Sequence, residues 1–301
     1  MFTGSGAPAR ALAPAARTSV TSAIVAAATS ILPLVERGQR IEARHLRAAM
    51  EAAFGASDAD GAWDWKAAYE ACEAAQILFL CKYAAALLAA KPDEYAVSNR
   101  LAKLARLFPV HTRRSEESVR LQQFSTPLPL AHAASFAACL TADDVVLEPS
   151  AGTGMLAAFA RAAGAHLHLN ELADTRAALL EALFEGVPVT RHDAAHIDDL
   201  LAPDMIPSVV LMNPPFSAIA HVDGRAPDAT MRHIGSALAR LAPGGRLVAI
   251  TGANFHPHHP RWGKAFDRIQ EYARVALTFA VHGSVFAAHG TSIDVRLTVI
   301  D

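Results

Sequence analysis

Charged residues, cysteines and long apolar runs are all scarce in this sequence. Charged residues make up 19% of the 301 residues, and the formal net charge is −2. A protein that holds nucleic acid by bulk electrostatics alone carries a large excess of basic residues, so this class is disfavoured. A nucleic-acid partner is still compatible with a local basic patch, because the distribution of charge matters more than its sum.

The chain has three cysteines, Cys72, Cys81 and Cys139, and none of them forms a Cys-x-x-Cys pair. The pattern suggests neither a zinc ribbon nor a disulfide framework, since both need characteristic cysteine spacings. A sparse and odd count is typical of a reducing compartment, and we expect the protein to be cytoplasmic.

No apolar run in this sequence reaches the length of a membrane span, so we expect no membrane partner. The apolar segment at residues 22–34 follows two arginines, and a targeting segment is the minor alternative for it. Thr29 and Ser30 interrupt this segment and Pro33 breaks it. We therefore interpret it as a buried helix.

The first third of the chain is rich in alanine and has apolar residues at helical spacing. Breaks fall at residues 55–61 and at residues 91–92. We expect a small helical domain over residues 1–115. Its predicted helices are residues 20–34, 42–54, 66–90 and 99–107.

Over residues 116–301, short β-branched runs alternate with helical stretches rich in alanine and leucine. This alternation indicates βαβ units and a parallel sheet that helices cover on both faces. The predicted strands are residues 145–147, 167–169, 188–190, 209–212, 247–250, 275–281 and 292–300. The predicted helices between them are residues 156–163, 175–184 and 231–241. The last two strands have a turn-rich connection and predict an antiparallel hairpin at the sheet edge.

Residues 100–120 connect the two parts, and the charged residues among them are mainly basic. The segment has two acids, Glu116 and Glu117, against six arginines or lysines and one histidine. It is either a solvated helix face or a strip that contacts phosphates beside the active site.

The segment Glu148-Pro-Ser-Ala-Gly-Thr-Gly154 follows an apolar strand and opens a helix. Its glycines allow a sharp turn at the carboxyl end of a strand, where open α/β sheets bind ligands. A phosphate-binding P-loop does not fit, because no Gly-Lys-Ser/Thr follows, and the Gly-x-Ser-x-Gly nucleophile elbow is also absent. The residues we expect to bind a cofactor here are Glu148, Pro149, Ser150, Ala151, Gly152 and Gly154.

Two further acids follow the next two predicted strands. Glu171 lies about twenty residues after the glycine loop, where an acid can accept hydrogen bonds from both ribose hydroxyls of a nucleotide. Asp193 lies at the same rim and could accept a hydrogen bond from an adenine amino group. We expect these acids, with Leu172 and Ala194 beside them, to line the cofactor site. The same features would also suit a nicotinamide dehydrogenase.

The fourth strand separates these two possibilities, since it ends in Asn213-Pro-Pro-Phe216. An aromatic amino group is a poor nucleophile because its lone pair is delocalised into the ring. The side-chain oxygen of Asn213 and the carbonyl of Pro214 could accept its two hydrogens and favour the form that attacks, which stabilises the transition state. Pro215 stiffens the backbone and Phe216 could stack on an extruded base. This chemistry needs no metal.

These motifs resemble those of class I N6-adenine DNA methyltransferases, which use S-adenosylmethionine. Gln123-Phe-Ser-Thr-Pro127 resembles the segment that flanks the methionine moiety of the cofactor in that family, and its place before the glycine loop resembles the gamma arrangement. The resemblance covers residues 120–301. It implies that Phe124, Thr126, Pro127 and Asn213 contact the cofactor and that Asn213, Pro214, Pro215 and Phe216 are catalytic.

The fold implied by this resemblance is α/β and Rossmann-like. It has a mostly parallel seven-stranded sheet with an antiparallel terminal hairpin, and a small helical domain precedes it. The implied partner is DNA, with RNA as the alternative. Gamma-type enzymes carry a target-recognition domain after the catalytic domain, and the helical part before residue 110 is a candidate replacement here.

A closer resemblance is to the methyltransferase-like region of bacterial strawberry notch-type proteins. It is carried by the segments Asn213-Pro-Pro-Phe-Ser-Ala218, Leu241-Ala-Pro-Gly-Gly-Arg-Leu-Val-Ala-Ile250 and His289-Gly-Thr-Ser-Ile-Asp294. In those proteins a helicase-like region follows, and this sequence has no Walker motif. We expect either a fragment of such a protein or a stand-alone version, with a helicase-like region as a partner.

A histidine cluster, His256, His258 and His259, could suggest a metal site. Prolines within the segment prevent a helical ligand pair, and no acid is adjacent, so we expect a loop near the substrate entrance and no metal. Three functions remain open on the sequence: methylation of adenine in DNA, methylation of an RNA base or a protein glutamine, and a binding module without turnover.

Overall fold

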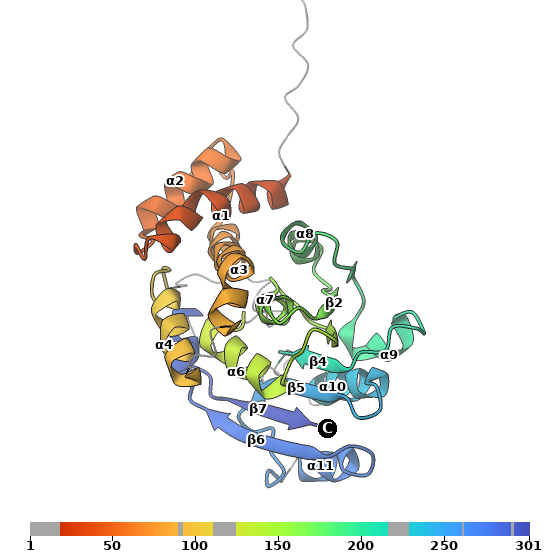
Figure 1. Ribbon diagram of the computed structural model, residues 1–301. Coiled ribbons are helices and arrows are strands. Elements are labelled where there is room, and N and C mark those ends of the chain that lie inside the picture. Colours follow the sequence, from red (N-terminus) through yellow and green to blue (C-terminus); the bar gives the residue numbers. More distant parts are fainter. Residues whose placement is uncertain (1–18, 90–92, 111–124, 216–228, 261, 290–291) are drawn as a thin grey trace, which may run out of the picture.

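In the computed structural model, the described residues are 19–89, 93–110, 125–215, 229–260, 262–289 and 292–301. Figure 1 shows a twisted sheet with helices packed around it, and a further group of helices from the N-terminal part beside them. The molecule is therefore an α/β protein with an N-terminal helical region, as the sequence predicts.

The sheet has seven strands in the order β3-β2-β1-β4-β5-β7-β6. Strands β1 to β5 are parallel, whereas β7 runs antiparallel to both β5 and β6. The strands are β1 (Val145–Glu148), β2 (His166–Asn170), β3 (Val189–Thr190), β4 (Val209–Met212), β5 (Arg246–Gly252), β6 (Val275–Val281) and β7 (Val295–Ile300). The strand order reverses direction between β1 and β4, which opens a crevice at their carboxyl ends.

Alternating side chains of the strands form two cores, one on each face of the sheet. Val146 and Leu211 belong to the first core, and Leu147 and Val210 belong to the second. Helices α6 (Leu128–Ala138), α7 (Met155–Ala162) and α8 (Asp174–Leu183) cover the first face. Helices α9 (Ile197–Leu200), α10 (Ala229–Arg240) and α11 (Gly263–Ile269) cover the second.

The N-terminal helices pack on the layer that covers the first face. They are α1 (Val20–Glu36), α2 (Ala43–Phe54), α3 (Trp65–Ala89) and α4 (Glu94–Ala105). Helix α3 lies along α7, α1 contacts α8, and α4 contacts α6. One continuous group of buried side chains includes these helices, α7 and the sheet. The predicted domain boundary at residues 115 and 116 lies outside the described residues and stays a prediction.

The length and composition of helix α3 do not fit the expectation that no apolar run could span a membrane. It is the one helix in the described ranges that is long and apolar enough to do so by length and composition, and half of its apolar stretch is buried inside the protein. Its buried residues include Glu70 and Glu73, each 3% exposed. Buried acids in contact with other elements of the chain indicate a central packing helix, because charged groups are costly in lipid.

A buried polar cluster joins α3 to the sheet region. Arg176 of α8 donates from Nε to Oε1 of Glu70 at 3.2 Å, and both side chains are almost fully buried. Thr153 donates from Oγ1 to Oε2 of Glu73 at 2.9 Å. Burial raises the pKa of Glu70, although Arg176 opposes this effect. Burial lowers the pKa of Arg176, but the nearby carboxylates of Glu73, Glu70 and Glu171 outweigh it and raise the pKa above its usual value.

Each predicted strand and helix is present, with ends that differ by a few residues. Helix α6 was not predicted, although its proline lies in the first turn, a position that proline fits well. Helix α1 continues through Pro33 to Glu36 instead of ending near the proline. The short helices α9 and α11 were also not predicted.

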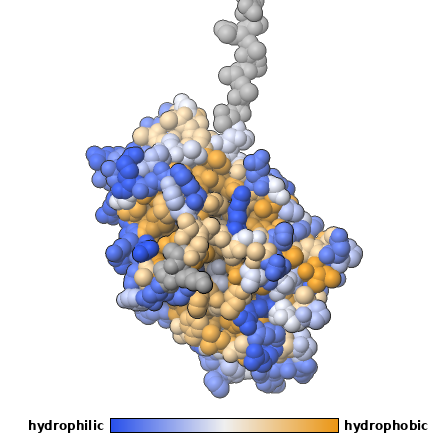
Figure 2. Space-filling model, in the orientation of Figure 1, coloured by the Kyte–Doolittle hydropathy of each residue, from blue (hydrophilic) through white to orange (hydrophobic). Residues whose placement is uncertain are grey.

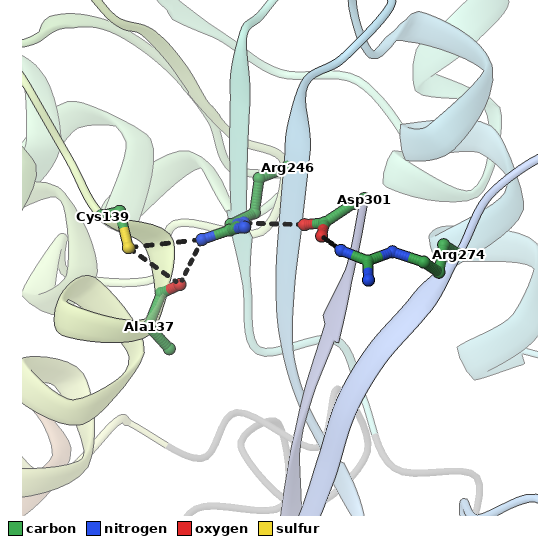
Figure 3. Close-up of polar contacts among 5 residues, drawn as sticks. All are labelled: Ala137, Cys139, Arg246, Arg274 and Asp301. Atoms are coloured by element: carbon green, nitrogen blue, oxygen red, sulfur yellow. Dashed lines mark hydrogen bonds and ion pairs between the residues drawn. The ribbon is translucent and has the colours of Figure 1, made fainter.

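An arginine network fastens the last strand to its neighbours (Figure 3). Arg246 of β5 donates from Nε to Oδ1 of Asp301 at 2.7 Å, and Arg274 donates from Nη2 to Oδ2 at 2.6 Å. Arg246 also donates from Nη1 to the carbonyl of Ala137 and to Sγ of Cys139, each at 3.3 Å. The network connects the end of α6 to β5, to the residue after β7 and to the residue before β6.

We expect Asp301→Asn to lower the free energy of unfolding by about 1–2 kcal/mol at pH 7, because two charge-assisted hydrogen bonds are lost. The hydrogen bond from Arg246, followed by that from Arg274, lowers the pKa of Asp301 in the folded protein. The contribution of the Asp301 carboxylate to the free energy of unfolding is therefore present above the unfolded pKa of about 3.9. It is lost as the pH falls through the pKa of the folded protein. Urea unfolding at several pH values measures this, with Asp267→Asn as an exposed control. An equal effect at low pH and neutral pH would contradict it.

Replacement of Arg176 should lower the free energy of unfolding far more than replacement of an exposed arginine. Arg176→Met leaves the buried carboxylate of Glu70 without its charged partner, and the expected loss is about 3–5 kcal/mol in the free energy of unfolding. The double variant Glu70→Met/Arg176→Met should recover much of this loss. Arg191→Met, at an arginine that pairs on the surface with Glu181, should cost less than about 1 kcal/mol. Equal losses for Arg176→Met and Arg191→Met would refute the role of the buried cluster.

Candidate functional site

A pocket opens at the carboxyl ends of the parallel strands, and its hollow encloses about 820 Å³ with its open mouth included. The lining residues that the sequence predicted are Thr126, Glu148, Pro149, Ser150, Ala151, Gly152, Glu171, Leu172, Asp193, Ala194, Asn213 and Pro215. Those that it did not predict are Ser125, Thr153, Met155, Ala173, Arg176, His192 and His233.

The glycine loop between β1 and α7 forms one wall. Gly152 has a φ of 58° and Gly154 a φ of 95°, a left-handed conformation that favours glycine. A Cβ at Gly152 would lie 3.6 Å from Nη1 of Arg176, whereas one at Gly154 would overlap the ring of Phe184. Gly154 therefore lets α7 pack against α8 and does not line the pocket.

Glu148 at the end of β1 is 2% exposed. Its Oε2 accepts a hydrogen bond from the N–H of Ala157 at 2.8 Å, so it satisfies one of the open donors in the first turn of α7. Burial raises the pKa of Glu148 well above its usual value. The side chain both lines the pocket and ties the glycine loop to the helix that follows.

Glu171 follows β2 and is held in place by two backbone donors. Its Oε2 accepts from the N–H of Gly152 at 2.8 Å, and its Oε1 accepts from the N–H of Ala173 at 2.9 Å. A carboxylate has about four acceptor positions, so both oxygens retain capacity for further donors such as hydroxyls. This acid is therefore oriented toward the glycine loop before any ligand binds.

Asn170 was not assigned a role from the sequence, yet it joins three segments of the pocket. It is fully buried, and its Nδ2 donates to the carbonyls of Pro149 and His192, each at 2.9 Å. Its Oδ1 accepts from Oγ1 of Thr190 and from the N–H of His192. The only signal in the sequence is its place at the end of a buried strand.

The segment after β3 contributes Asp193 and Ala194. Asp193 is exposed, and its Oδ1 accepts from the N–H of Ala195 at 2.9 Å at the start of a 3-10 turn. His233 of α10 lines the same part of the pocket, and burial lowers its pKa, so its imidazole is neutral at pH 7. No pattern around His233 in the sequence points to this position.

Asn213 follows the fully buried strand β4 and reaches the pocket beside the glycine loop. Its Nδ2 donates to Oγ1 of Thr126 at 3.1 Å, which fixes the plane of the amide and turns its oxygen away from Thr126. The carbonyl of Pro215 accepts from Oγ1 of Thr230 at 3.2 Å. The Asn-Pro-Pro turn is thus braced from α10 and from the residue two positions before α6.

The remaining predicted residues are not among the lining residues of the pocket or fall outside the described ranges. Pro127 is buried as the N-cap of α6, and Pro214 is buried in the turn after β4. Phe124 and Phe216 lie outside the described residues. Among the described residues, no group of three or more His, Cys, Asp or Glu side chains could hold a metal ion, and this includes His256, His258 and His259.

Residues 133–281 match the family model of the methyltransferase small domain. No curated protein matches the chain. Three solved structures are similar to part of this chain. A type I restriction-modification system methyltransferase subunit from Streptococcus thermophilus has a TM-score of 0.50 and 16% identity, over 60% of this chain and 44% of that one.

A protein from Pyrococcus horikoshii assigned as an RNA methyltransferase has a TM-score of 0.49 and 19% identity, over 69% of this chain and 97% of that one. TrmN from Thermus thermophilus has a TM-score of 0.45 and 18% identity, over 63% of this chain and 54% of that one. The match therefore spans about half of two of these proteins and almost all of the third.

The mostly parallel sheet with its antiparallel end, the glycine loop and the matching family model have one common explanation. Residues 133–281 form a methyltransferase small domain, and the protein is a class I methyltransferase that depends on S-adenosylmethionine.

Proposed function

We propose that this methyltransferase transfers the methyl group of S-adenosylmethionine to the N6 amino group of adenine in DNA. The observation that carries the proposal is the position of Asn213. Its amide lies at the cofactor pocket, and its donor end is engaged by Thr126. The acceptor end is the one that an amino group needs, because two acceptors favour the nucleophilic form of that group.

The described residues fit the cofactor in chemical terms. Glu171 supplies a carboxylate that backbone donors hold beside Gly152, which suits the two ribose hydroxyls. Asp193 and the neutral imidazole of His233 are suited to the adenine ring on the β3 side of the pocket. Ser150, Ala151 and the other loop residues then approach the cofactor through their backbone. When bound, the cofactor supplies a methyl group on a sulfonium ion, which leaves as a neutral thioether.

The protein's part in the reaction is positioning and charge stabilisation. The Oδ1 of Asn213 and the carbonyl of Pro214 accept the two hydrogens of the target amino group, whose nitrogen gains positive charge as its bond to carbon forms. Phe216 stacks on the extruded base. Asn213 and Pro214 would hold the amino nitrogen where it could receive the methyl group that the bound cofactor would supply, and the surplus proton would pass to water.

We propose that, among class I enzymes, the chain is of the gamma-like N6-adenine type and is related to strawberry notch-type proteins. A helicase-like region would then act with it on DNA. We propose a reducing cytoplasm as the location, because the sparse and odd cysteine count of the sequence is typical of such a compartment.

The proposal is tested by incubation of the protein with methyl-labelled S-adenosylmethionine and unmethylated plasmid DNA, tRNA or total protein in parallel. We expect N6-methyladenine in nucleosides from the DNA. Label in tRNA or in protein glutamine would replace the proposed substrate by one of the two alternatives. No label in any sample, with cofactor binding retained in calorimetry, would favour a binding module.

Asn213→Ala should reduce methyl transfer by at least about 10²–10³-fold, because an acceptor for the reacting amino group is lost. Its affinity for S-adenosylmethionine should stay within about threefold of the wild-type value. Gln270→Ala, which removes an exposed amide at the end of α11, is the matched control and should retain full activity. Equal turnover by Asn213→Ala and the wild type would disprove the proposed mechanism.

Glu171→Gln should weaken the binding of S-adenosylmethionine by about 10–100-fold. The amide has the same size but cannot offer two charged acceptors to the ribose, and each such hydrogen bond contributes about 1.5–3 kcal/mol. Isothermal titration calorimetry measures the affinity. Glu185→Gln, at an exposed acid after α8, is the control for the lost charge. Unchanged affinity in Glu171→Gln would remove the ribose role from this residue.

A further inference from the structure

Helix α4 presents a polar face that the cofactor site does not use. Val97, Leu101 and Leu104 are buried on its inner side. The outer side is made up of exposed residues of α4 and of the residue that caps its C-terminus. These residues are Tyr95, Asn99, Arg100, Lys103 and Arg106. These five residues are called the α4 face below. The other basic residues of segment 100–120 lie outside the described residues.

Within the described residues, the three cations of the α4 face have no acidic partner. None of the ion pairs among the described residues includes Arg100, Lys103 or Arg106, whereas the exposed Arg44 and Arg191 do pair with acids. The one acid of α4 itself, Glu94, contacts Nε2 of His132 at 3.3 Å. A protein with a net charge of −2 therefore has a local stripe of positive charge on this helix.

Helix stability alone does not account for this arrangement. Cations near a helix C-terminus interact favourably with the helix dipole, which explains Lys103 and Arg106 but not Arg100 in the middle of α4. Like charges three residues apart repel one another across the helix surface. Tyr95 is 74% exposed, so its ring has little contact with the protein. Unpaired cations beside an exposed aromatic ring are the combination that binds nucleic-acid strands.

Helix α4 is linked to one edge of the cofactor pocket through α6. Helix α4 packs against α6, and α6 begins two residues after Thr126, which lines the pocket. Figure 1 shows α4 and α6 next to each other, and Figure 2 shows hydrophilic surface along the same side of the molecule. The N–H of Ile41 donates to the carbonyl of Leu107, which brings the exposed Arg40 to the end of α4 as well.

We propose that the α4 face is a docking surface for DNA. It contacts the phosphate backbone beside the target adenine. This inference rests on the proposed function and adds to it the side of the molecule along which the DNA runs. Arg100, Lys103 and Arg106 contact phosphates, and Tyr95 stacks on a sugar or on a base next to the extruded one. The helical region in front of the catalytic domain then takes part in substrate binding.

The test is the triple variant Arg100→Gln/Lys103→Gln/Arg106→Gln, studied as the full chain. Binding to a fluorescent, unmethylated 30-base-pair duplex is measured by anisotropy over a series of salt concentrations. We expect at least about tenfold weaker binding at low salt. Each lost phosphate contact reduces the slope of log affinity against log salt by about 0.9, so the slope should become shallower by about 2–3. A role in folding alone would not change this slope.

The control Arg161→Gln/Lys264→Gln/Arg268→Gln removes the same formal charge from exposed positions on α7 and α11. It should bind DNA within about twofold of the wild type. Tyr95→Ala should weaken binding several-fold, and Tyr95→Phe should restore it, since the ring and not the hydroxyl makes the contact. Both triple variants should bind S-adenosylmethionine normally.

The outcomes separate this inference from the proposed function. A wild-type salt slope and affinity in the α4 variant would overturn the docking surface, even if the enzyme methylates DNA. A wild-type protein that binds DNA through α4 but methylates no adenine would uphold the surface and refute the proposed function. No binding of DNA by the wild type, or binding of RNA of the same sequence at least tenfold more tightly, would overturn the assignment to DNA.

Discussion

The buried amide of Asn170 is the contact on which the pocket geometry depends. It donates to the carbonyls of Pro149 and His192 and accepts from Thr190 and from the N–H of His192, so both ends of the amide are satisfied. In a dry interior such a network is strong when complete and costly when one partner is missing. It therefore holds the ends of β1, β2 and β3 in one arrangement, and the acids that follow these strands are aligned as a consequence.

The N-terminal helices belong to the support of the same site. Glu70 and Glu73 of α3 reach Arg176 and Thr153, and both of these partners line the pocket. Buried charges are costly unless they are paired, which makes the position of α3 strongly dependent on α8 and the glycine loop. Helix α3 thus connects the helical region to the floor of the cofactor site, while α4 extends that region toward the side where α6 begins.

The chemistry at the pocket depends on differences between similar groups. Glu148 is buried and caps α7, whereas Glu171 is held by backbone donors and faces the loop, so two acids of the same type take different roles. Asn213 differs from Asn170 in the same way. Asn170 uses both ends of its amide inside the fold. In Asn213 the amide nitrogen donates to Thr126, so the side-chain oxygen points away from Thr126.

The sequence by itself determined the features that depend on local patterns. The β-branched runs predict the seven strands, and the glycine loop, the acid after β2 and Asn213-Pro-Pro predict where the site lies, because parallel strands end at one edge. Helix α6 was missed, although Pro129 lies in its first turn, where proline is compatible with a helix. The clamp at Asn170, the Glu70–Arg176 pair and the pocket position of His233 were decided only by tertiary structure. The Glu70–Arg176 pair joins residues 106 positions apart, and no local pattern encodes a contact over such a separation.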